Sequence, residues 1–260
     1  MIVEALLLIL AALGREHRAF KETLPLDMAP YSVDDQYKGC AKKMAKLVET
    51  KYLEKEIDNS GDFKIAWKKG NEFVRTPNDK HLTKNHLIAI YVYSDTNIYK
   101  PFNHDTRRAK KLYEKRKYKW YSLHFLLTDA IQILKKTQNS CYDTYRGTKA
   151  EFDKKLLNKT VRFGQFTSSS RDQEIARRFG KVSCFEIYTC KGAYVAEYSK
   201  LPREEEVLIP PYETFNVADV KTRETQNNLW CDTVYVLKSS GERSDLNCAL
   251  FEKPIKNVLK

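Results

Sequence analysis

The chain has 260 residues, which is enough for one large domain with a substantial buried core. Its formal net charge is +12, from 46 basic and 34 acidic side chains, so anionic partners would be attracted to it. Its long apolar run, Ala5–Leu13, has nine residues and is too short to cross a bilayer, so a membrane-spanning protein is not predicted.

Met1–Gly14 is predicted to be a secretory signal peptide. The apolar run suits the central region of such a signal, and the small residues Ala12 and Gly14 suit a cleavage site after Gly14. Glu4 departs from the pattern, since signals usually begin with basic residues, and a buried N-terminal helix is the alternative. The sequence ends without the hydrophobic tail that a lipid anchor needs, so we expect a secreted, extracellular product.

Six cysteines fit an oxidising compartment. They include no C-x-x-C pair and have no neighbouring histidines, so up to three disulfides are predicted rather than a zinc site, and fifteen full pairings are open. The sequon that begins at Asn158 indicates glycosylation in the same compartment. The cysteines are Cys40, Cys141, Cys184, Cys190, Cys231 and Cys248.

The first half of the chain is predicted to be mainly helical. Residues 16–32 contain two prolines and read as an extended lead-in. Apolar residues at helical spacing then predict a surface helix from Cys40 to about Ile57. After a break at residues 59–61, a second helix begins near Phe63, and residues 82–93 form a third helical or mixed apolar segment.

Positive charge is concentrated in Arg107–Lys119. A helix there, capped by Asp105 or Thr106, would place most lysines on one side. This side is either a solvated helix face or a surface that attracts anionic glycans, cell surfaces or a phosphate-bearing ligand. Nucleic acid is not predicted as a partner, because no reader motif is present. Trp120–Leu134 follows and should be the most buried helix.

The second half of the chain is predicted to form strands, because short runs rich in β-branched and aromatic residues alternate with turn residues. One short helix is expected over Arg171–Phe179. The predicted strands are Tyr142–Arg146, Val182–Thr189, Ala193–Glu197, Val207–Ile209, Thr214–Val217 and Val234–Leu237. The sequence thus predicts an α+β fold in a single domain, residues 15–260, with a helical part over about 33–138 and a mainly β core over about 139–260.

Three polar stretches of the second half are candidates for chemistry, and the first is Glu204–Glu206. In an extended backbone Glu204 and Glu206 would project from one face. Two carboxylates placed there could stabilise developing positive charge and accept a proton. A solvated acidic turn before a strand is the alternative.

The other two stretches carry an arginine and a run of hydroxyls. Arg146 ends a predicted strand, its planar fork suits a pyrophosphate, and Gly147 would let a ligand approach the backbone. A strand-end arginine in solvent or in a salt bridge is the alternative. Residues 167–170 supply four consecutive hydroxyls. One of them could cap the helix that follows, which leaves the other hydroxyls unexplained by capping. No G-x-S-x-G motif accompanies them, so a serine hydrolase is not predicted.

In this order, the three stretches resemble the R-S-E class of mono-ADP-ribosyltransferases, and more closely the vertebrate arginine-specific ecto-enzymes. The matching pieces are Y-R-G-T at 145–148, R-F-G-Q-F-T-S-S-S at 162–170, F-E-I-Y-T-C at 185–190, E-E-E-V-L-I-P-P-Y-E-T-F at 204–215 and N-C at 247–248. The resemblance covers nearly the whole chain after the signal. It implies a C-terminal β-sandwich NAD-binding core of the ADP-ribosyltransferase type.

The resemblance also implies a role for each site residue. Arg146 would hold the NAD phosphates, and the backbone of Gly147 would face the nicotinamide amide. Ser168 would help to position the ribose and the catalytic glutamate. Glu206 would stabilise the oxocarbenium-like charge as nicotinamide leaves. Glu204 would orient the acceptor guanidinium and help to remove its proton.

Two disulfides are implied by the resemblance as well, Cys40–Cys248 and Cys141–Cys190. Cys184 and Cys231 lie outside the family pattern, and a bridge between them would be one possible third disulfide.

The sequence departs from the family at two points. Ser169 stands where many relatives carry threonine, and the membrane-anchor tail of several relatives is missing. No G-x-G-x-x-G follows a strand, so an NAD site must be built from side chains.

We therefore predict a secreted NAD-dependent enzyme that transfers ADP-ribose from NAD to arginine side chains of acceptor proteins and releases nicotinamide. NAD is the co-substrate, no metal is expected, and the chain is expected to be a monomer without a stable membrane anchor. One alternative is an NAD glycohydrolase, against which Glu204 argues. Another is a catalytically inactive secreted protein that binds anionic glycans.

Overall fold

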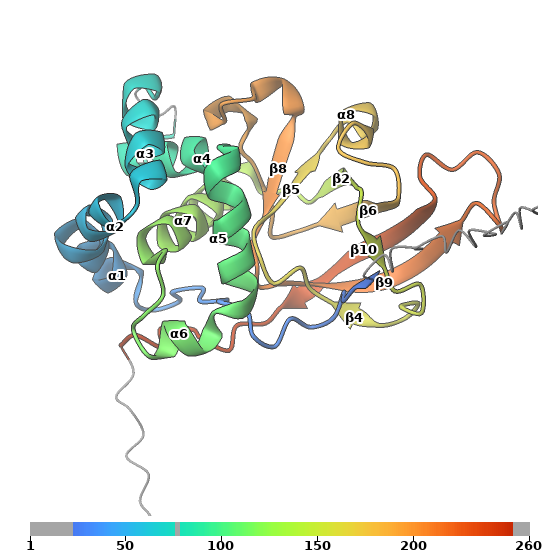
Figure 1. Ribbon diagram of the computed structural model, residues 1–260, viewed down its shortest axis with the longest axis horizontal. Helices are drawn as coiled ribbons and strands as arrows, with labels where there is room; N and C mark the ends of the chain where they lie inside the picture. Colours follow the sequence, from blue (N-terminus) through green and yellow to red (C-terminus); the bar gives the residue numbers. More distant parts are fainter. Residues whose placement is uncertain (1–22, 76–78, 252–260) are drawn as a thin grey trace, which may run out of the picture.

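The structure is a computed structural model and describes residues 23–75 and 79–251. The predicted signal peptide, residues 1–14, lies outside the described residues. The helices of the N-terminal half gather on one side of the molecule and most strands on the other (Figure 1). The predicted α+β fold class, a helical N-terminal half packed on a mainly β core, is therefore confirmed. No helix in the described ranges has the length and apolar character needed to span a membrane.

Helices α1 to α7 form the N-terminal half and share one buried core. The predicted helix from Cys40 to Ile57 is confirmed, because α1, a π-helical turn and α2 follow one another without a break. The second helix begins after Ser60, whose hydroxyl accepts a hydrogen bond from the Phe63 amide at 3.3 Å. The bounds are α1 Ala41–Leu47, the π-helical turn Val48–Tyr52, α2 Leu53–Asn59, α3 Gly61–Phe73, α4 Lys84–Tyr93, α5 Thr96–Arg108, α6 Lys110–Glu114 and α7 Tyr121–Gln138.

The predicted helix over Arg107–Lys119 is confirmed only in part, because α5 runs to Arg108 and α6 covers only Lys110–Glu114. The predicted cap at Asp105 or Thr106 is wrong, since both residues lie inside α5. Helix α6 ends at Glu114, and a turn follows in which Arg116 has a φ of 59°. This left-handed conformation cannot continue a right-handed helix. Tyr118 holds the turn in place, since it is buried and its hydroxyl lies 2.8 Å from the hydroxyl of Thr106.

Helix α5 was not predicted, because Pro101 lies inside it and proline disfavours the helix interior. Its start does carry a signal, since the Asp95 carboxylate accepts a hydrogen bond from the Asn97 amide at 3.0 Å. Helix α7 is confirmed, but it is not the most buried helix. Eight of the ten residues of α4 are buried, compared with eleven of the eighteen residues of α7.

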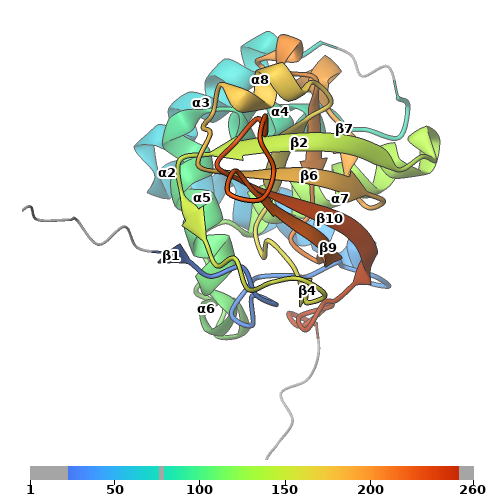
Figure 2. The same cartoon turned by 90° about the vertical axis from the view of Figure 1, so that its right-hand side faces the viewer.

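The strands of the C-terminal half form one mixed sheet with the order β4-β9-β10-β6-β2-β5-β8-β7. Figure 2 shows β2, β6, β10 and β9 side by side. Residues 193–197 were predicted as one strand, but β7 ends at Tyr194 and residues 196–198 form a 3-10 turn, η2. The bounds are β2 Tyr142–Thr148, β4 Thr160–Val161, β5 Thr167–Ser170, β6 Ser183–Thr189, β7 Ala193–Tyr194, β8 Glu206–Ile209, β9 Glu213–Thr222 and β10 Thr233–Glu242, with α8 Gln173–Arg177 between β5 and β6. A separate two-stranded pair joins β1 Thr23–Leu24 to β3 Glu151–Phe152.

The sheet consists of two wings that meet at a fork. Strand β2 pairs with β6 over seven residues, but it pairs with β5 only at Tyr145 and Ser170. The larger wing is β4-β9-β10-β6-β2, and the smaller wing is β5-β8-β7. Phe166, Ala193 and Leu208, in or next to the smaller wing, belong to the helical core, so the helices pack against that wing. The two wings take the place of the two separate layers of the expected sandwich.

Three disulfides are present in the structure. Cys40–Cys248 joins the start of α1 to the C-terminal segment across a sequence separation of 208 residues. Cys141–Cys190 lies at the end of the β2–β6 ladder. Cys184–Cys231 joins β6 to the loop before β10. The first two are the pairs that the resemblance implied, and the third joins the two cysteines that it left unassigned.

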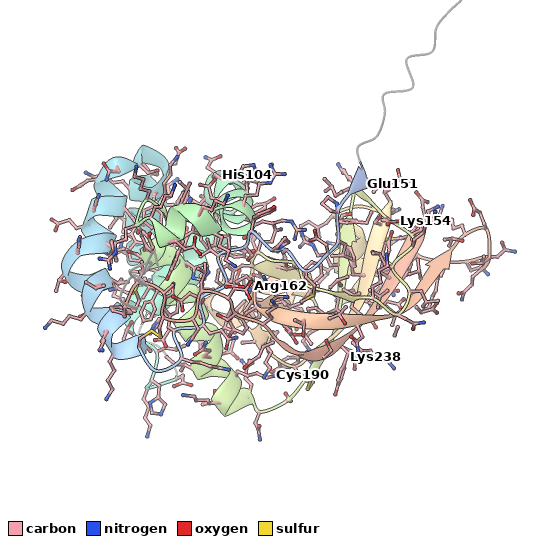
Figure 3. All side chains as sticks on the ribbon, turned by 90° about the horizontal axis from the view of Figure 1, so that it is seen from below. His104, Glu151, Lys154, Arg162, Cys190 and Lys238 are labelled. Carbon is pink, nitrogen blue, oxygen red and sulfur yellow. A yellow bond between two sulfur atoms is a disulfide. The ribbon has the colours of Figure 1, made fainter. Side chains whose placement is uncertain are left out.

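A buried ion pair joins distant segments where the helical half meets the sheet. Arg162, which follows β4, lies in this region in Figure 3. Its Nη1 is 2.6 Å from Oδ2 of Asp34, and both side chains are fully buried. The guanidinium also donates to the carbonyls of Met28, Ala29 and Arg243. The extended lead-in, the larger wing and the C-terminal segment are thus held by one side chain.

Candidate active site

A cavity of about 460 Å³ opens at the fork between the two wings. Its walls come from both halves of the chain: the end of α4, the start of α5, strands β2 and β5, helix α8 and the turn before β8. Arg146, Gly147, Ser168, Glu204 and Glu206 all line it. A more open hollow of about 570 Å³ near the end of α7 contains none of these residues.

Arg146 extends from β2 into the gap that the fork creates. Beyond the Tyr145–Ser170 pair, β2 and β5 make no further ladder bonds, and Arg146 Nη1 donates to the Ser168 carbonyl at 2.6 Å instead. Burial lowers the pKa of the Arg146 guanidinium. The group nevertheless remains positively charged, because arginine does not lose its proton in proteins. Among the described residues this is the one hydrogen bond of the guanidinium, so the rest of its fork is available to an anionic ligand.

Of the three consecutive serines on β5, Ser168 is the one whose hydroxyl makes no hydrogen bond to the described backbone. The Ser169 hydroxyl donates to the Val207 carbonyl at 3.0 Å, and the Ser170 hydroxyl accepts a hydrogen bond from the Asp172 amide at 3.0 Å. These two serines therefore stabilise the smaller wing and the start of α8. The Ser168 hydroxyl faces Glu206 instead, where its hydrogen bonding lowers the pKa of that carboxyl.

Glu206 is the first residue of β8, and 6% of its surface is exposed. Burial raises the pKa of its carboxyl above the ordinary value of 4.5, and the nearby charge of Glu204 raises it further. Hydrogen bonding from Ser168 and Ser199 and the charge of Arg146 act in the opposite direction. The carboxyl is therefore buried, and Ser168, Ser199 and Arg146 favour its ionised form.

Glu204 and Glu206 both line the cavity, but not for the reason predicted. The backbone between them is not extended, because Glu204 ends a 3-10 turn, η3 (Pro202–Glu204), and Glu205 is left-handed with a φ of 48°. The left-handed residue turns its own side chain away, to accept a hydrogen bond from the Tyr194 hydroxyl at 3.1 Å. Burial raises the pKa of Glu204 as well.

Gly147 is required by the fold as well as being close to the ligand space. A Cβ at this position would lie 2.4 Å from the carbonyl oxygens of Ala176 and Gly180, at the end of α8 and the turn that follows it. Gly180 has a φ of 155°, and a Cβ there would lie 2.2 Å from the carbonyl carbon of Thr148. The two glycines let this segment pack directly against β2 and form one wall of the cavity.

The sequence did not indicate that the helical half contributes to the site. Tyr93, the last residue of α4, is buried in the cavity wall, where its hydroxyl donates to the Phe166 carbonyl and accepts from Asn103, both at 3.0 Å. Ser94 and Tyr99 also line the cavity from this side. These residues end or follow an apolar helical run, and no pattern in the sequence brings them to β5 and β8.

Two further predicted features were a lack of metal ligands and a glycosylation site. No group of three or more histidine, cysteine, aspartate or glutamate side chains in the described part of the chain could hold a metal ion. Asn158 is exposed in a turn before β4, with a φ of 62°. Its side chain is accessible to a glycosylating enzyme, and its glycosylation stays a prediction.

Comparisons with known proteins match residues 26–238 to the family described as "ART: NAD:arginine ADP-ribosyltransferase". NAD(P)(+)--arginine ADP-ribosyltransferase 2 of Gallus gallus is 36% identical over 239 residues, which are 88% of this chain and 74% of the relative. Ecto-ADP-ribosyltransferase 4 of Pan troglodytes is 33% identical over 97% of this chain and 82% of the relative. A GPI-linked NAD(P)(+)--arginine ADP-ribosyltransferase 1 of Mus musculus is 35% identical over 88% of this chain and 74% of the relative.

Solved structures show the same similarity. The eucaryotic mono-ADP-ribosyltransferase ART2.2 matches with a TM-score of 0.74 at 32% identity, over 88% of this chain and 100% of that chain. A mutant of ART2.2 in complex with NAD matches with a TM-score of 0.71 at 30% identity over the same shares. The cavity at the fork thus occurs in a chain that shares its fold with a structure solved with NAD bound.

Proposed function

The chain belongs to the NAD:arginine ADP-ribosyltransferase family, and from this premise we propose that it uses the cavity at the fork to transfer ADP-ribose from NAD to arginine side chains of proteins. The observation that carries the proposal is that one cavity brings together Arg146, Ser168, Glu204 and Glu206 from three separate segments of the chain. NAD is consumed as a co-substrate, and nicotinamide is released.

In this proposal Arg146 binds the pyrophosphate of NAD. Its guanidinium is already held by the Ser168 carbonyl, so its remaining donors are oriented before the ligand arrives. A bidentate bond to phosphate oxygens suits a planar guanidinium better than it suits an ammonium group. Gly147 also lines the cavity, and its backbone would face the nicotinamide amide.

The bond that breaks joins C1′ of the ribose to the pyridinium nitrogen of nicotinamide. Its electron pair leaves with nicotinamide, which becomes neutral, so the leaving group needs no proton. Positive charge develops on the ribose, and the ionised Glu206 carboxylate stabilises it at a buried position, where such an interaction is stronger than in water. Ser168 positions the carboxylate and the ribose.

Glu204 determines which nucleophile completes the reaction. A guanidinium nitrogen of the acceptor forms the new bond to C1′, and its proton passes to the Glu204 carboxylate. The raised pKa of Glu204 suits it to accept that proton. Without this carboxylate water would compete, which would turn the site towards the hydrolysis of NAD.

The test uses labelled NAD with agmatine as an arginine mimic. We expect the native protein to label agmatine, Glu206→Gln to consume no NAD, and Glu204→Gln to lose transfer to agmatine while it still releases free ADP-ribose. Glu205→Gln is the matched control, because Glu205 lies between the two but bonds to Tyr194 away from the cavity, and it should keep both activities. Equal loss of transfer and hydrolysis in Glu204→Gln would overturn the division of labour between the two carboxylates.

We further propose that the enzyme acts outside the cell as a secreted monomer, in keeping with its three disulfides and with relatives named as ecto-enzymes. Its proteinaceous acceptors would then be extracellular. Expression of the full chain in animal cells tests this, since the product should collect in the medium. Retention on the cell surface that a phospholipase specific for glycolipid anchors abolishes would contradict it.

The basic turn after α6 favours a second, weaker interaction with anionic glycans. Lys115, Lys117 and Lys119 are exposed, whereas Tyr118 between them is buried and the Arg116 guanidinium donates to the Leu250 carbonyl at 3.0 Å. The turn therefore presents three lysines from an ordered backbone. Changing these three lysines to glutamine should lower the salt concentration that elutes the protein from heparin, with agmatine modification unchanged.

A further inference from the structure

The Cys184–Cys231 disulfide packs against the segment that forms the glycine wall of the cavity. Cys184 is the partner of Gly147 in the β2–β6 ladder, and both cysteines are fully buried. The carbonyl oxygen of Gly180 is 3.6 Å from Cys184 Sγ and 3.9 Å from Cys231 Sγ. The same oxygen would lie 2.4 Å from a Cβ at Gly147. The Gly180 peptide is therefore held between the disulfide and the backbone of Gly147, which lines the cavity.

The disulfide also attaches the loop before β10 to this wall. Residues 223–228 of the loop are exposed, whereas Cys231 is fully buried. Next to Cys231, the Asp232 amide donates to the Lys181 carbonyl at 2.9 Å. The loop is thus held to the turn after α8 by a covalent bond and by hydrogen bonding of the backbone beside it.

Trp230, which precedes Cys231, connects the same loop to the fork. Its ring packs against Tyr145, with the ring centroids 6.1 Å apart and the ring planes at 86°. Its Nε1 donates to Oε1 of Glu186 on β6 at 3.2 Å, which orients the indole. Tyr145 lines the cavity, and it is the residue through which β2 pairs with β5. The loop therefore supports the cavity at the point where the two wings meet.

We propose that the Cys184–Cys231 disulfide is a positioning element for NAD binding: it holds the Gly180 peptide and Trp230 against β2, so that Gly147 and Tyr145 are in place before the ligand arrives. The inference rests on the proposed function and deepens it. A site that is ordered in advance loses less conformational freedom on binding, which raises affinity. The two cysteines do not line the cavity, so the disulfide acts through its neighbours and not through contact with NAD.

The test compares two variants that each lack one disulfide. Cys141–Cys190 spans a sequence separation of 49 residues and Cys184–Cys231 one of 47, so either loss should relax the unfolded chain by a similar amount. Cys184→Ala/Cys231→Ala and Cys141→Ala/Cys190→Ala should therefore both unfold at lower urea concentrations than the native protein.

The two variants should differ in NAD binding. Cys184→Ala/Cys231→Ala should raise the KM for NAD by about 10-fold, with a smaller change in kcat, since small displacements of a binding site are costly. Cys141→Ala/Cys190→Ala is the matched control and should keep the native KM. Its disulfide lies at the end of the β2–β6 ladder that is far from Gly147, and neither of its cysteines lines the cavity.

Trp230→Leu keeps the disulfide and provides a second test if the first variant does not fold. It removes the ring that packs against Tyr145 and should raise the KM for NAD by about 3-fold, the size expected for loss of one aromatic pair. Trp67→Leu is its matched control, because Trp67 has the same exposed fraction of 9% and lies in α3, outside the cavity. It should leave the KM unchanged.

The inference is overturned if the two disulfide variants have the same KM for NAD, or, where Cys184→Ala/Cys231→Ala does not fold, if Trp230→Leu and Trp67→Leu do. The proposed function fails instead if the native protein binds NAD, measured by calorimetry, but transfers no label to agmatine. The Kd for NAD then takes the place of the KM in the same comparisons.

Discussion

Glu56 in α2 is a buried carboxyl outside the cavity, and it illustrates how burial at one residue makes stability depend on pH. Both of its oxygens lie 3.1 Å from the Ser122 amide nitrogen at the start of α7. Burial raises its pKa from 4.5 to about 8, against hydrogen bonds that lower it. Because the folded pKa is the higher one, the stability that Glu56 contributes is present below the unfolded value and is lost as pH rises through about 8.

Glu56→Gln should therefore remove this pH dependence. We expect the native protein and the variant to unfold at similar urea concentrations at pH 4.5. At pH 9 the variant should be more stable, by up to a few kcal/mol, since one pKa unit corresponds to about 1.4 kcal/mol. Glu54→Gln, an exposed change on the same helix, should leave the curves unchanged. Parallel curves for the native protein and Glu56→Gln would show that the carboxyl is not held neutral.

At the same scale, the sequence allowed the main site residues to be identified but not their support. Arg146, Ser168, Glu204 and Glu206 carry motifs that can be read along the chain. Tyr93 carries no such motif, because its place in the cavity wall depends on contacts with Phe166 and Asn103 that form only in the folded molecule. The left-handed Glu205 also escaped prediction, since no glycine or asparagine marks that position.

Among the elements, strand β2 depends on the glycines that let the end of α8 approach it. Gly147→Ala would place a methyl group 2.4 Å from two backbone carbonyl oxygens. Relief of this clash would require a displacement of the backbone, which is energetically costly. We expect the wall of the cavity to shift, with a KM for NAD raised by about 10-fold or more, since small displacements of a binding site are costly. Gly61→Ala, where a Cβ meets nothing within 4 Å, is the control and should bind NAD normally. An unchanged KM in Gly147→Ala would mean that this wall does not contact NAD.

The elements that were mispredicted share a physical cause. The helical spacing across Arg107–Lys119 does not account for Tyr118. This side chain is buried against Thr106, and its contact stabilises a turn in place of a helix. Helix α5 forms in spite of Pro101 because Ile98 and Phe102 are buried in the helical core, and tertiary packing outweighs local propensity. Long, periodic segments such as α7 were predictable because their pattern alone specifies the buried face.

For the molecule as a whole, the Arg162–Asp34 pair is expected to be the most sensitive single contact outside the cavity. Arg162→Met removes one partner of a fully buried pair and leaves the Asp34 charge and three carbonyls without their donor. We expect a loss of about 3–5 kcal/mol in the free energy of unfolding, measured by urea denaturation. Arg223→Met breaks an exposed pair with Asp232 and should cost less than about 1 kcal/mol. Similar losses for the two variants would contradict the role of the buried pair.

The overall architecture was predictable because composition changes midway along the chain, from helical spacing to alternating strands. The fork was not, since it arises where β2 and β5 diverge after one pair of residues, and pairing between strands far apart in sequence leaves no local signal. The active-site cavity lies at that divergence. Its position is therefore a property of the folded sheet, even though its chemistry could be inferred from motifs.

The Cys40–Cys248 bond closes nearly all of the described chain into a covalent circle. A single cut within that circle, for instance by trypsin in the exposed segment 223–228, frees no fragment, because both pieces stay joined through sulfur. Such nicked molecules would migrate at full size in a non-reducing gel and split only after treatment with dithiothreitol. If the protein acts outside the cell, as proposed above, a single proteolytic cut of this kind would leave its two pieces covalently joined.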